Sequence, residues 1–241
     1  MPEMMPEEKV TGSSMNFLSR FMGIFFSPKK IFSDVDAGVP WWQPWIWVSL
    51  LNMIVVYIFI PVQIQLYRLT EDQIPKEQFD QTLQHMQSFP LKYLGIIPTP
   101  VVVLIAGLIF AAASYIAVSV LSERASFKKH LTLYFYASIV ASLGVLVSNL
   151  VVRAKGIDNI RTIRDGVAPF GPAAFVPEGQ KIPYAILSTL DIFSLWFYAL
   201  IALGVMHVFR LSWRSAVLVV IPIWLLSVLI ALVGARFGAA M

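Results

Sequence analysis

The chain has 241 residues, of which 58% are hydrophobic and only 13% are charged, and its formal net charge is +4. A soluble domain of this size carries about one quarter charged residues and could not bury so much apolar surface, so the composition predicts a membrane protein. The basic residues are spread thinly along the chain, which argues against nucleic-acid binding. The absence of cysteine excludes disulfides, thiolate metal sites and a cysteine nucleophile.

Residues 1–12 are polar and are predicted to form a disordered tail, and the first forty residues show no signal-peptide pattern. The segment 13–40 then contains a stretch, Met15 to Ser27, in which polar and small residues recur at helical spacing and phenylalanines cover the rest. Such a helix either lies in the headgroup plane of the membrane, which we favour, or packs on the end of a helix bundle. The expected membrane-surface anchors are Phe17, Phe21, Phe25, Lys29 and Lys30, joined by Trp41 and Trp42 at the next boundary.

The rest of the chain, 41–236, is predicted to be a transmembrane domain of five helices. Each apolar block reaches the ~20 residues needed to cross ~30 Å of hydrocarbon. Two polar connections interrupt the blocks, and the first of them carries Phe79, Leu83 and Met86 at helical spacing, which predicts a second surface helix. The predicted spans are 41–62, 94–121, 130–152, 183–209 and 215–233. The predicted fold is an all-α, polytopic helix bundle with an amphipathic interfacial helix at its N-terminus.

Five spans place the two termini on opposite sides of the membrane. A raw count of basic residues is balanced between the two sides. The short loops on the side of the N-terminus are the more densely basic, and short loops carry the topological signal. We therefore expect a cytoplasmic N-terminus.

Polar residues inside the spans are costly in lipid, so each requires a reason. The fourth span carries one helical stripe, and the third carries another that should face it across the bundle. The first stripe consists of Tyr184, Ser188, Asp191, Ser194 and Tyr198, and the second of Tyr134, Ser138, Ser142 and Asn149.

Asp191 has two interpretations. It could be a proton or cation site in a transport path, because intramembrane carboxylates often act as relays. Alternatively, it could be a buried anchor that accepts hydrogen bonds from Ser188, a tyrosine or backbone N–H groups. We favour the second interpretation, since the spans offer no basic partner at mid-depth and no second carboxylate.

Motifs for catalysis are absent from the sequence. The histidines His85, His130 and His207 lie in separate segments, and no zinc-binding pair, nucleophile elbow or phosphate-binding loop is present. The sequence therefore predicts no enzyme, no cofactor and no metal site.

The order of these features resembles the bacterial branch of the Yip domain family, over about residues 16–233. The opening FLSRFMGIFFSPKKIFSDV places Phe25, Pro28 and Phe32 at the family's recurring positions, and a short basic loop follows the second span. The most specific part is LSTLDIFSLWFYALIALGVMHVFRLSWRSAVLVV, with Leu190, Asp191, Phe193, Trp196, Leu200, Gly204 and Ser212 placed as in bacterial members.

This resemblance implies five spans, a cytoplasmic N-terminus in the bacterial inner membrane, and a non-enzymatic role. Eukaryotic relatives act with prenylated GTPases, but their Asp-Leu-Tyr-Gly-Pro element is missing here, which argues against GTPase binding. Some bacterial relatives are encoded beside ABC exporters. The leading hypothesis is a non-catalytic scaffold or helper that binds other membrane proteins, such as an ABC exporter, associates with itself, or organises the lipid bilayer. The alternative is a small transporter or channel that uses Asp191 as its ion site.

Overall fold

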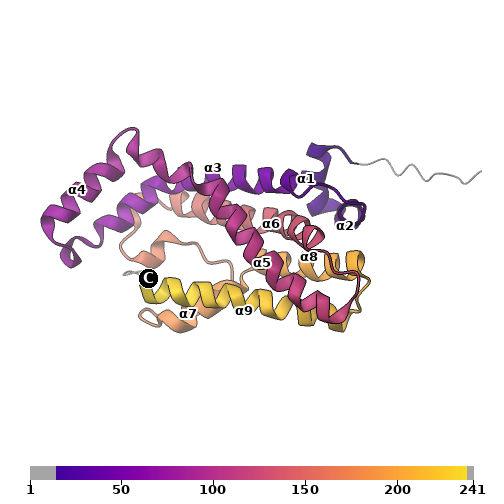
Figure 1. The fold of residues 1–241 in the computed structure, drawn as a ribbon. Helices are drawn as coiled ribbons and strands as arrows, with labels where there is room; N and C mark the ends of the chain where they lie inside the picture. The colour runs from indigo at the N-terminus through magenta and orange to yellow at the C-terminus, as the bar shows by residue number, and fades with distance from the viewer. Residues whose placement is uncertain (1–14, 238–241) are drawn as a thin grey trace, which may run out of the picture.

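The computed structural model describes residues 15–237, so the predicted tail 1–12 lies outside the described residues. Within residues 15–237 every regular element is helical, and five helices are long and apolar enough to cross a membrane (Figure 1). This confirms the all-α bundle with five candidate spans. The spanning helices are α3 (Trp42–Arg68), α5 (Thr99–Leu121), α6 (Phe127–Ala154), α8 (Ile192–Phe209) and α9 (Trp213–Phe237).

The ends of these helices differ from the prediction in ways that follow from local chemistry. The second span begins as a 3-10 turn, η2 (Leu91–Ile96), and becomes α-helical only at Thr99. Pro100 lies in the first turn of α5, where its missing N–H costs no hydrogen bond. The predicted helix 183–209 is wrong in its first part, because α7 (Lys181–Leu187) and the 3-10 turn η6 (Ser188–Leu190) precede a new helix start at Ile192.

Helix α6 occupies the centre of the bundle and contacts α3, α5 and α8. The side chains of Leu133, Phe135 and Ile139 are at most 1% exposed, as expected for a helix that is covered on several sides. A Cβ atom on Gly107 of α5 would lie 2.4 Å from Phe135, and one on Gly204 of α8 would lie 2.3 Å from Leu133. Small residues on the neighbours therefore allow close approach to α6, as in many membrane bundles.

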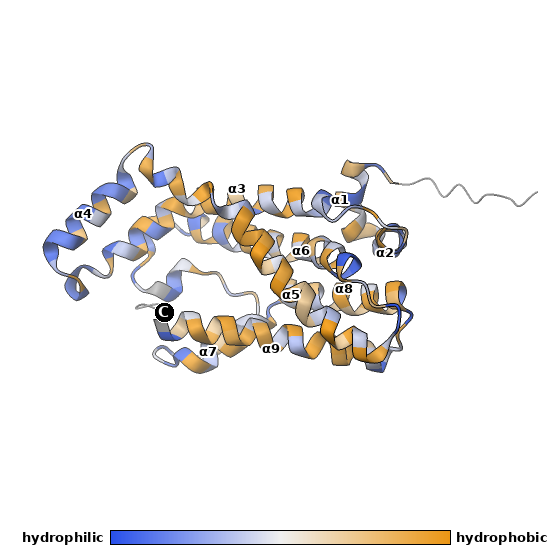
Figure 2. Ribbon diagram, viewed as in Figure 1, coloured by the Kyte–Doolittle hydropathy of each residue, from blue (hydrophilic) through white to orange (hydrophobic). Residues whose placement is uncertain are grey.

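The helices outside the spans lie at opposite ends of the bundle. The pair α1 (Phe17–Phe26) and α2 (Pro28–Asp36) packs on one end, and the hydrophilic helix α4 (Lys76–Gln87) projects at the other (Figures 1 and 2). The surface helix expected from Phe79 is present as α4, and Phe79 itself is buried against the ring of Tyr67. A second helix, α2, follows the expected stretch Met15 to Ser27 directly, and Pro28 occupies its first turn, where the missing N–H costs no hydrogen bond.

The second polar connection, between α6 and α7, is built from short 3-10 turns. These are η3 (Ile157–Asn159), η4 (Ile163–Gly166) and η5 (Pro172–Phe175). The connection covers a small second core in which Val62 of α3 and Val152 of α6 meet Ile160 and Ala168. It therefore closes the end of the bundle that α4 occupies.

Candidate functional site

The polar residues of α6 face the interior of the bundle and form hydrogen bonds there. Ser142 and Asn149 are buried, and the Ser142 hydroxyl accepts a 2.8 Å hydrogen bond from the Asn52 side-chain amide of α3. The Asn149 Nδ2 donates to the Val145 carbonyl at 2.9 Å, but the Asn149 Oδ1 has no hydrogen-bond partner among the described residues. The stripe thus combines satisfied groups with one unpaired acceptor.

Asp191 lies at the N-terminus of α8 rather than within a continuous span. Its backbone is extended, and its Oδ1 accepts hydrogen bonds from the Phe193 and Ser194 N–H groups at 2.8 and 3.1 Å. The Ser194 hydroxyl donates to the other carboxylate oxygen. These are the N–H groups that a helix start leaves unpaired, and the partial positive charge of the helix N-terminus favours an anion there. Asp191 therefore acts as an N-cap.

Two adjacent cavities lie beside this helix start. The first has a volume of about 350 Å³ and lies between α3, α6 and the segment 166–173, with Asn149 and Asp191 in its wall. The second has a volume of about 470 Å³ and lies among α3, α5, α6, α8 and α9, with Asn52 and Tyr134 in its wall. Both are lined by Ala141, Val145, Ser188 and Ser194.

All six intramembrane candidates from the sequence line one or both of these cavities. They are Tyr134, Asn149, Ser188, Asp191, Ser194 and Tyr198. Helical periodicity could place the two stripes inside the bundle, but it missed Thr189 and Ser227, which also line the second cavity. Ser227 is the only strongly polar residue in the middle of α9, so no stripe marked it.

The arrangement offers hydroxyl and amide groups and a single carboxylate, all in a largely apolar setting. No group of three or more His, Asp or Glu residues suited to a metal ion occurs within residues 15–237. The hydroxyl and amide groups suit uncharged ligands, and the carboxylate of Asp191 could hold one cation.

A serine–histidine pair does form across α5 and α6. The Ser114 hydroxyl lies 2.9 Å from His130 Nδ1, and the imidazole stacks on the Phe209 ring at 4.1 Å between centroids. His130 is only 1% exposed, and neither residue lines either of the cavities described above. The pair lies in the buried interior, where it links α5 to α6.

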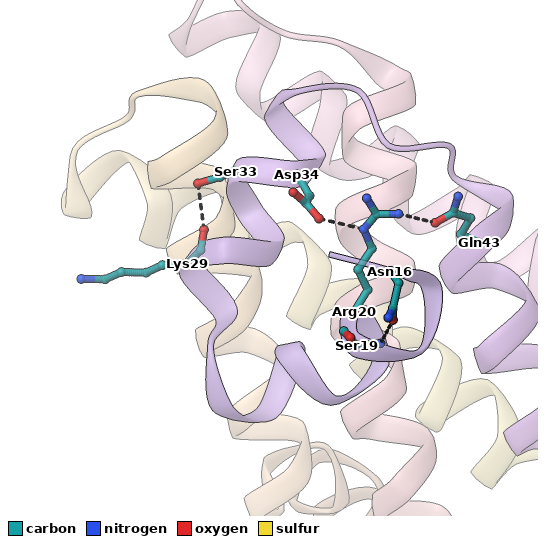
Figure 3. A network of polar contacts seen from close by, with 7 residues as sticks. All are labelled: Asn16, Ser19, Arg20, Lys29, Ser33, Asp34 and Gln43. Atoms are coloured by element: carbon teal, nitrogen blue, oxygen red, sulfur yellow. Dashed lines mark hydrogen bonds and ion pairs between the residues drawn. The ribbon is translucent and has the colours of Figure 1, made fainter. Parts of the chain in front are cut away.

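At the N-terminal end, α1 and α2 are held to the bundle by charged groups (Figure 3). The Arg20 Nε donates to the Asp34 carboxylate at 2.7 Å, and the Arg20 Nη1 donates to the Gln43 side-chain oxygen at 2.7 Å. The Arg20 and Asp34 side chains are only 11% and 17% exposed. One guanidinium therefore links α1, α2 and the start of α3.

A second ionic contact joins the end of α2 to the bundle. The Asp36 carboxylate accepts a 2.7 Å hydrogen bond from Lys129 of α6, and Arg210 lies 3.7 Å away. The hydrogen bond from the Lys129 ammonium holds the pKa of Asp36 below its usual value. Neither ionic contact was predicted from the sequence, since Asp34 and Asp36 gave no signal of a partner on α1 or α6.

The predicted membrane-surface anchors fall into two groups. Phe21 and Phe25 pack inward on the rings of Trp47 and Trp196, and Trp41 packs against Phe135. Lys29, Lys30 and Trp42 are exposed, and Phe17 is 37% exposed while its ring stacks on that of Trp47 at 4.8 Å between centroids. The outward apolar face of α1 is instead made by Leu18, Met22 and Phe26, which are 63%, 48% and 78% exposed. The helix is therefore rotated relative to our expectation, because Arg20 turns inward toward Asp34.

Five long apolar helices, with polar side chains turned into the bundle and shorter helices at its two ends, define a polytopic α-helical membrane protein. The Yip1 domain family matches residues 22–235, and the chain therefore belongs to this family, which confirms the assignment from the sequence. The chain is 24% identical to "Membrane protein YknW" of Bacillus subtilis (strain 168) over 240 residues, which cover 96% of this chain and 98% of that relative. No solved structure matches the chain.

Proposed function

We propose that this Yip1 domain protein is a non-catalytic scaffold or helper that binds another membrane protein within the bilayer. The observation that supports the proposal is the exposed apolar face of α9. Of the five candidate spans, α9 is the least buried, and Leu218, Leu225 and Leu229 on it are each more than half exposed. Such a face is covered either by lipid or by the helices of a partner. An ABC exporter is the partner class that the family resemblance suggests.

The charges at the two ends of the bundle support a cytoplasmic N-terminus. The short connections between α5 and α6 and between α8 and α9 lie at the α1–α2 end and are basic, and short loops carry the signal of the positive-inside rule. At the α1–α2 end the basic residues are Arg20, Lys29, Lys30, Arg124, Lys128, Lys129, Arg210 and Arg214, against Asp34, Asp36 and Glu123. The basic residues of the other end lie mainly in or beside the two long connections, and they are Arg68, Lys76, Lys92, Arg153, Lys155, Arg161, Arg164, Lys181 and Arg236.

In this orientation the α1–α2 pair anchors to the inner leaflet. The row Leu18, Met22 and Phe26 lies on one face of α1, with Lys29 and Lys30 exposed beside it. Apolar side chains at the acyl boundary and lysines at lipid phosphates are the usual pattern of an interfacial helix. The α1–α2 pair would therefore attach to the bundle through the ion pairs of Arg20 and Asp36, and it would face lipid through the apolar row Leu18, Met22 and Phe26.

Co-purification from native membranes in mild detergent tests the scaffold proposal. We expect a stoichiometric membrane partner with the wild type. A Leu225→Trp variant should lose it, because the larger ring disturbs the exposed face of α9. Ile116→Trp places the same ring on the exposed face of α5 and serves as the matched control. A chain that always elutes alone from native membranes would contradict the proposal, whereas a second copy as its only companion would reduce it to self-association.

A second candidate function is a small transporter or channel, and it is favoured by the two adjacent cavities that share Ser188 and Ser194. In this function Asp191 would hold the proton or cation. Flux into reconstituted vesicles should then be lost in Asp191→Asn, which keeps the helix cap but removes the charge. If neither the wild type nor the variant shows flux, transport is excluded.

A further inference from the structure

We propose that the 350 Å³ cavity between α3, α6 and the segment 166–173 binds an amphiphile with a non-anionic, hydrogen-bond-donating head group. The size and lining of the cavity are the first reason. Its wall is mainly apolar, with Val56, Phe59 and Phe193 among its residues, and its volume lies in the ~300–1,000 Å³ range of small-molecule sites. Close-packed interiors rarely leave a space of this size empty. An aliphatic chain suits such walls.

The unpaired acceptor in the wall is the second reason. Asn149 lines the cavity and is only 6% exposed, and its Oδ1 has no donor within the described part of the chain. The orientation of this amide is fixed, because only its NH2 group can donate to the Val145 carbonyl, at 2.9 Å. Buried polar atoms are normally hydrogen-bonded, and a hydroxyl or amine of the ligand would donate a hydrogen bond to the Asn149 oxygen.

The charge of the wall is the third reason. Asp191 is the only charged residue among the described residues that line this cavity. A carboxylate in an apolar surrounding repels an anionic head group strongly, since the effective dielectric constant is low there. Asp191 therefore selects against phosphate and carboxylate heads, while Asn149 selects for a donor. The two residues together define the ligand class.

The segment 166–173, which covers the cavity, is held in place by hydrogen bonds to α6. The Ser148 hydroxyl donates to the Ala168 carbonyl at 3.1 Å and accepts from the Ala168 N–H at 3.0 Å. Next to it, a Cβ atom on Gly171 would lie 2.8 Å from the Asp191 Cα, so the cover lies directly on the helix start. The segment 166–173 is therefore fixed to α6 and to the start of α8, and it forms a defined wall of the cavity.

Three probes with the same twelve-carbon chain test the proposal on the purified full-length protein in detergent. Dodecanol is uncharged and donates a hydrogen bond, methyl dodecanoate only accepts, and dodecanoate at pH 8 is an anion. A ligand that binds only the folded state raises the thermal unfolding midpoint in a concentration-dependent way. We expect dodecanol to raise the midpoint of the wild type and the other two probes to do so much less.

Substitutions assign the effect to the cavity. Asn149→Leu removes the acceptor and should weaken dodecanol binding about tenfold, as expected for one lost hydrogen bond in a buried site. Asn52→Leu is the matched control, because Asn52 is an intramembrane amide that lines the other cavity and not this one. Val56→Phe reduces the volume with Asn149 intact, and it supplies the same test should Asn149→Leu fail to fold.

Three results would overturn the proposal. The first is equal binding of the three probes, which would mean unselective partition of an alkyl chain. The second is an unchanged dodecanol response in both Asn149→Leu and Val56→Phe. The third is no shift with any probe, which would mean that the cavity holds water only.

Discussion

The α1–α2 end of the bundle and the cavity beside Asp191 both bury polar side chains, but they satisfy them with different chemistry. The α1–α2 end uses ion pairs, in which Arg20 binds Asp34 and Lys129 binds Asp36. The cavity region uses neutral hydroxyls and amides, and its single carboxylate is saturated by the N-terminus of α8. Ion pairs are tolerable at a bundle end near water, whereas in the apolar cavity wall the N–H groups of a helix start stabilise the single carboxylate.

Removal of the Arg20 guanidinium should have the largest effect on stability. In Arg20→Met the Asp34 carboxylate keeps its shielded position without a partner, and we expect the docking of α1–α2 to lose about 2–3 kcal/mol, somewhat less than for a fully buried pair. Hydrogen exchange of the α1 and α2 amides measures this loss. The double variant Arg20→Met/Asp34→Leu should recover most of it, because no charge is then left unpaired. A double variant as unstable as the single one would refute the charge-based explanation.

Loss of the Asp191 cap should have an intermediate effect. In Asp191→Ala the Phe193 and Ser194 N–H groups lose their acceptor, which should cost about 1–2 kcal/mol of stability, as for other helix caps. Asp191→Asn should cost clearly less, since asparagine caps helices about as well as aspartate. Thermal unfolding in detergent compares the two variants. Equal losses in both would show that the negative charge, and not the cap, stabilises the helix start.

Acidification should have the smallest effect. The pKa of Asp36 is lowered in the folded protein by its hydrogen bond to Lys129, so the unfolded chain takes up its proton first as the pH falls. The contribution of Asp36 is therefore present above pH ~4 and is lost as the pH falls through the lowered folded-state pKa. We expect it to be about 0.5 kcal/mol or less, because the pair is partly exposed. The proteolysis rate of α2 should rise at low pH in the wild type but change less in Asp36→Asn.

The two regions also differ in how far they could be predicted from the sequence. The spans α3, α5, α6 and α9 were found because each is a long apolar block, and the polar stripes were placed inside the bundle because they repeat at helical spacing. The break before α8 was missed, although an Asp before an apolar run is a known signal of a helix start. Apolar residues lie on both sides of Asp191, so the segment was predicted as one continuous helix.

The inward rotation of α1 could not be predicted from the sequence. Its phenylalanines predicted a lipid-facing helix, but Phe21 and Phe25 meet tryptophans of α3 and α8, far away in the chain. Likewise, nothing near Asp34 or Asp36 showed that their partners would lie on α1 and α6. Contacts between distant segments depend on which helices become neighbours, and a single sequence does not state this.

The sequence by itself determined the solvent of this protein, the number of its candidate spans and the presence of polar stripes inside the bundle, and its motifs pointed to its family. The solvent, the spans and the stripes follow from hydrophobic length and periodicity, which are local, whereas the family was inferred from a resemblance of motifs. Only the tertiary structure decided that Asp191 caps a helix, that the Asn149 oxygen beside a cavity has no donor among the described residues, and that α1 and α2 are held by ion pairs. Each of these depends on where a helix begins or on which helices touch, because hydrogen bonds and charge pairs require partners within about 3–4 Å.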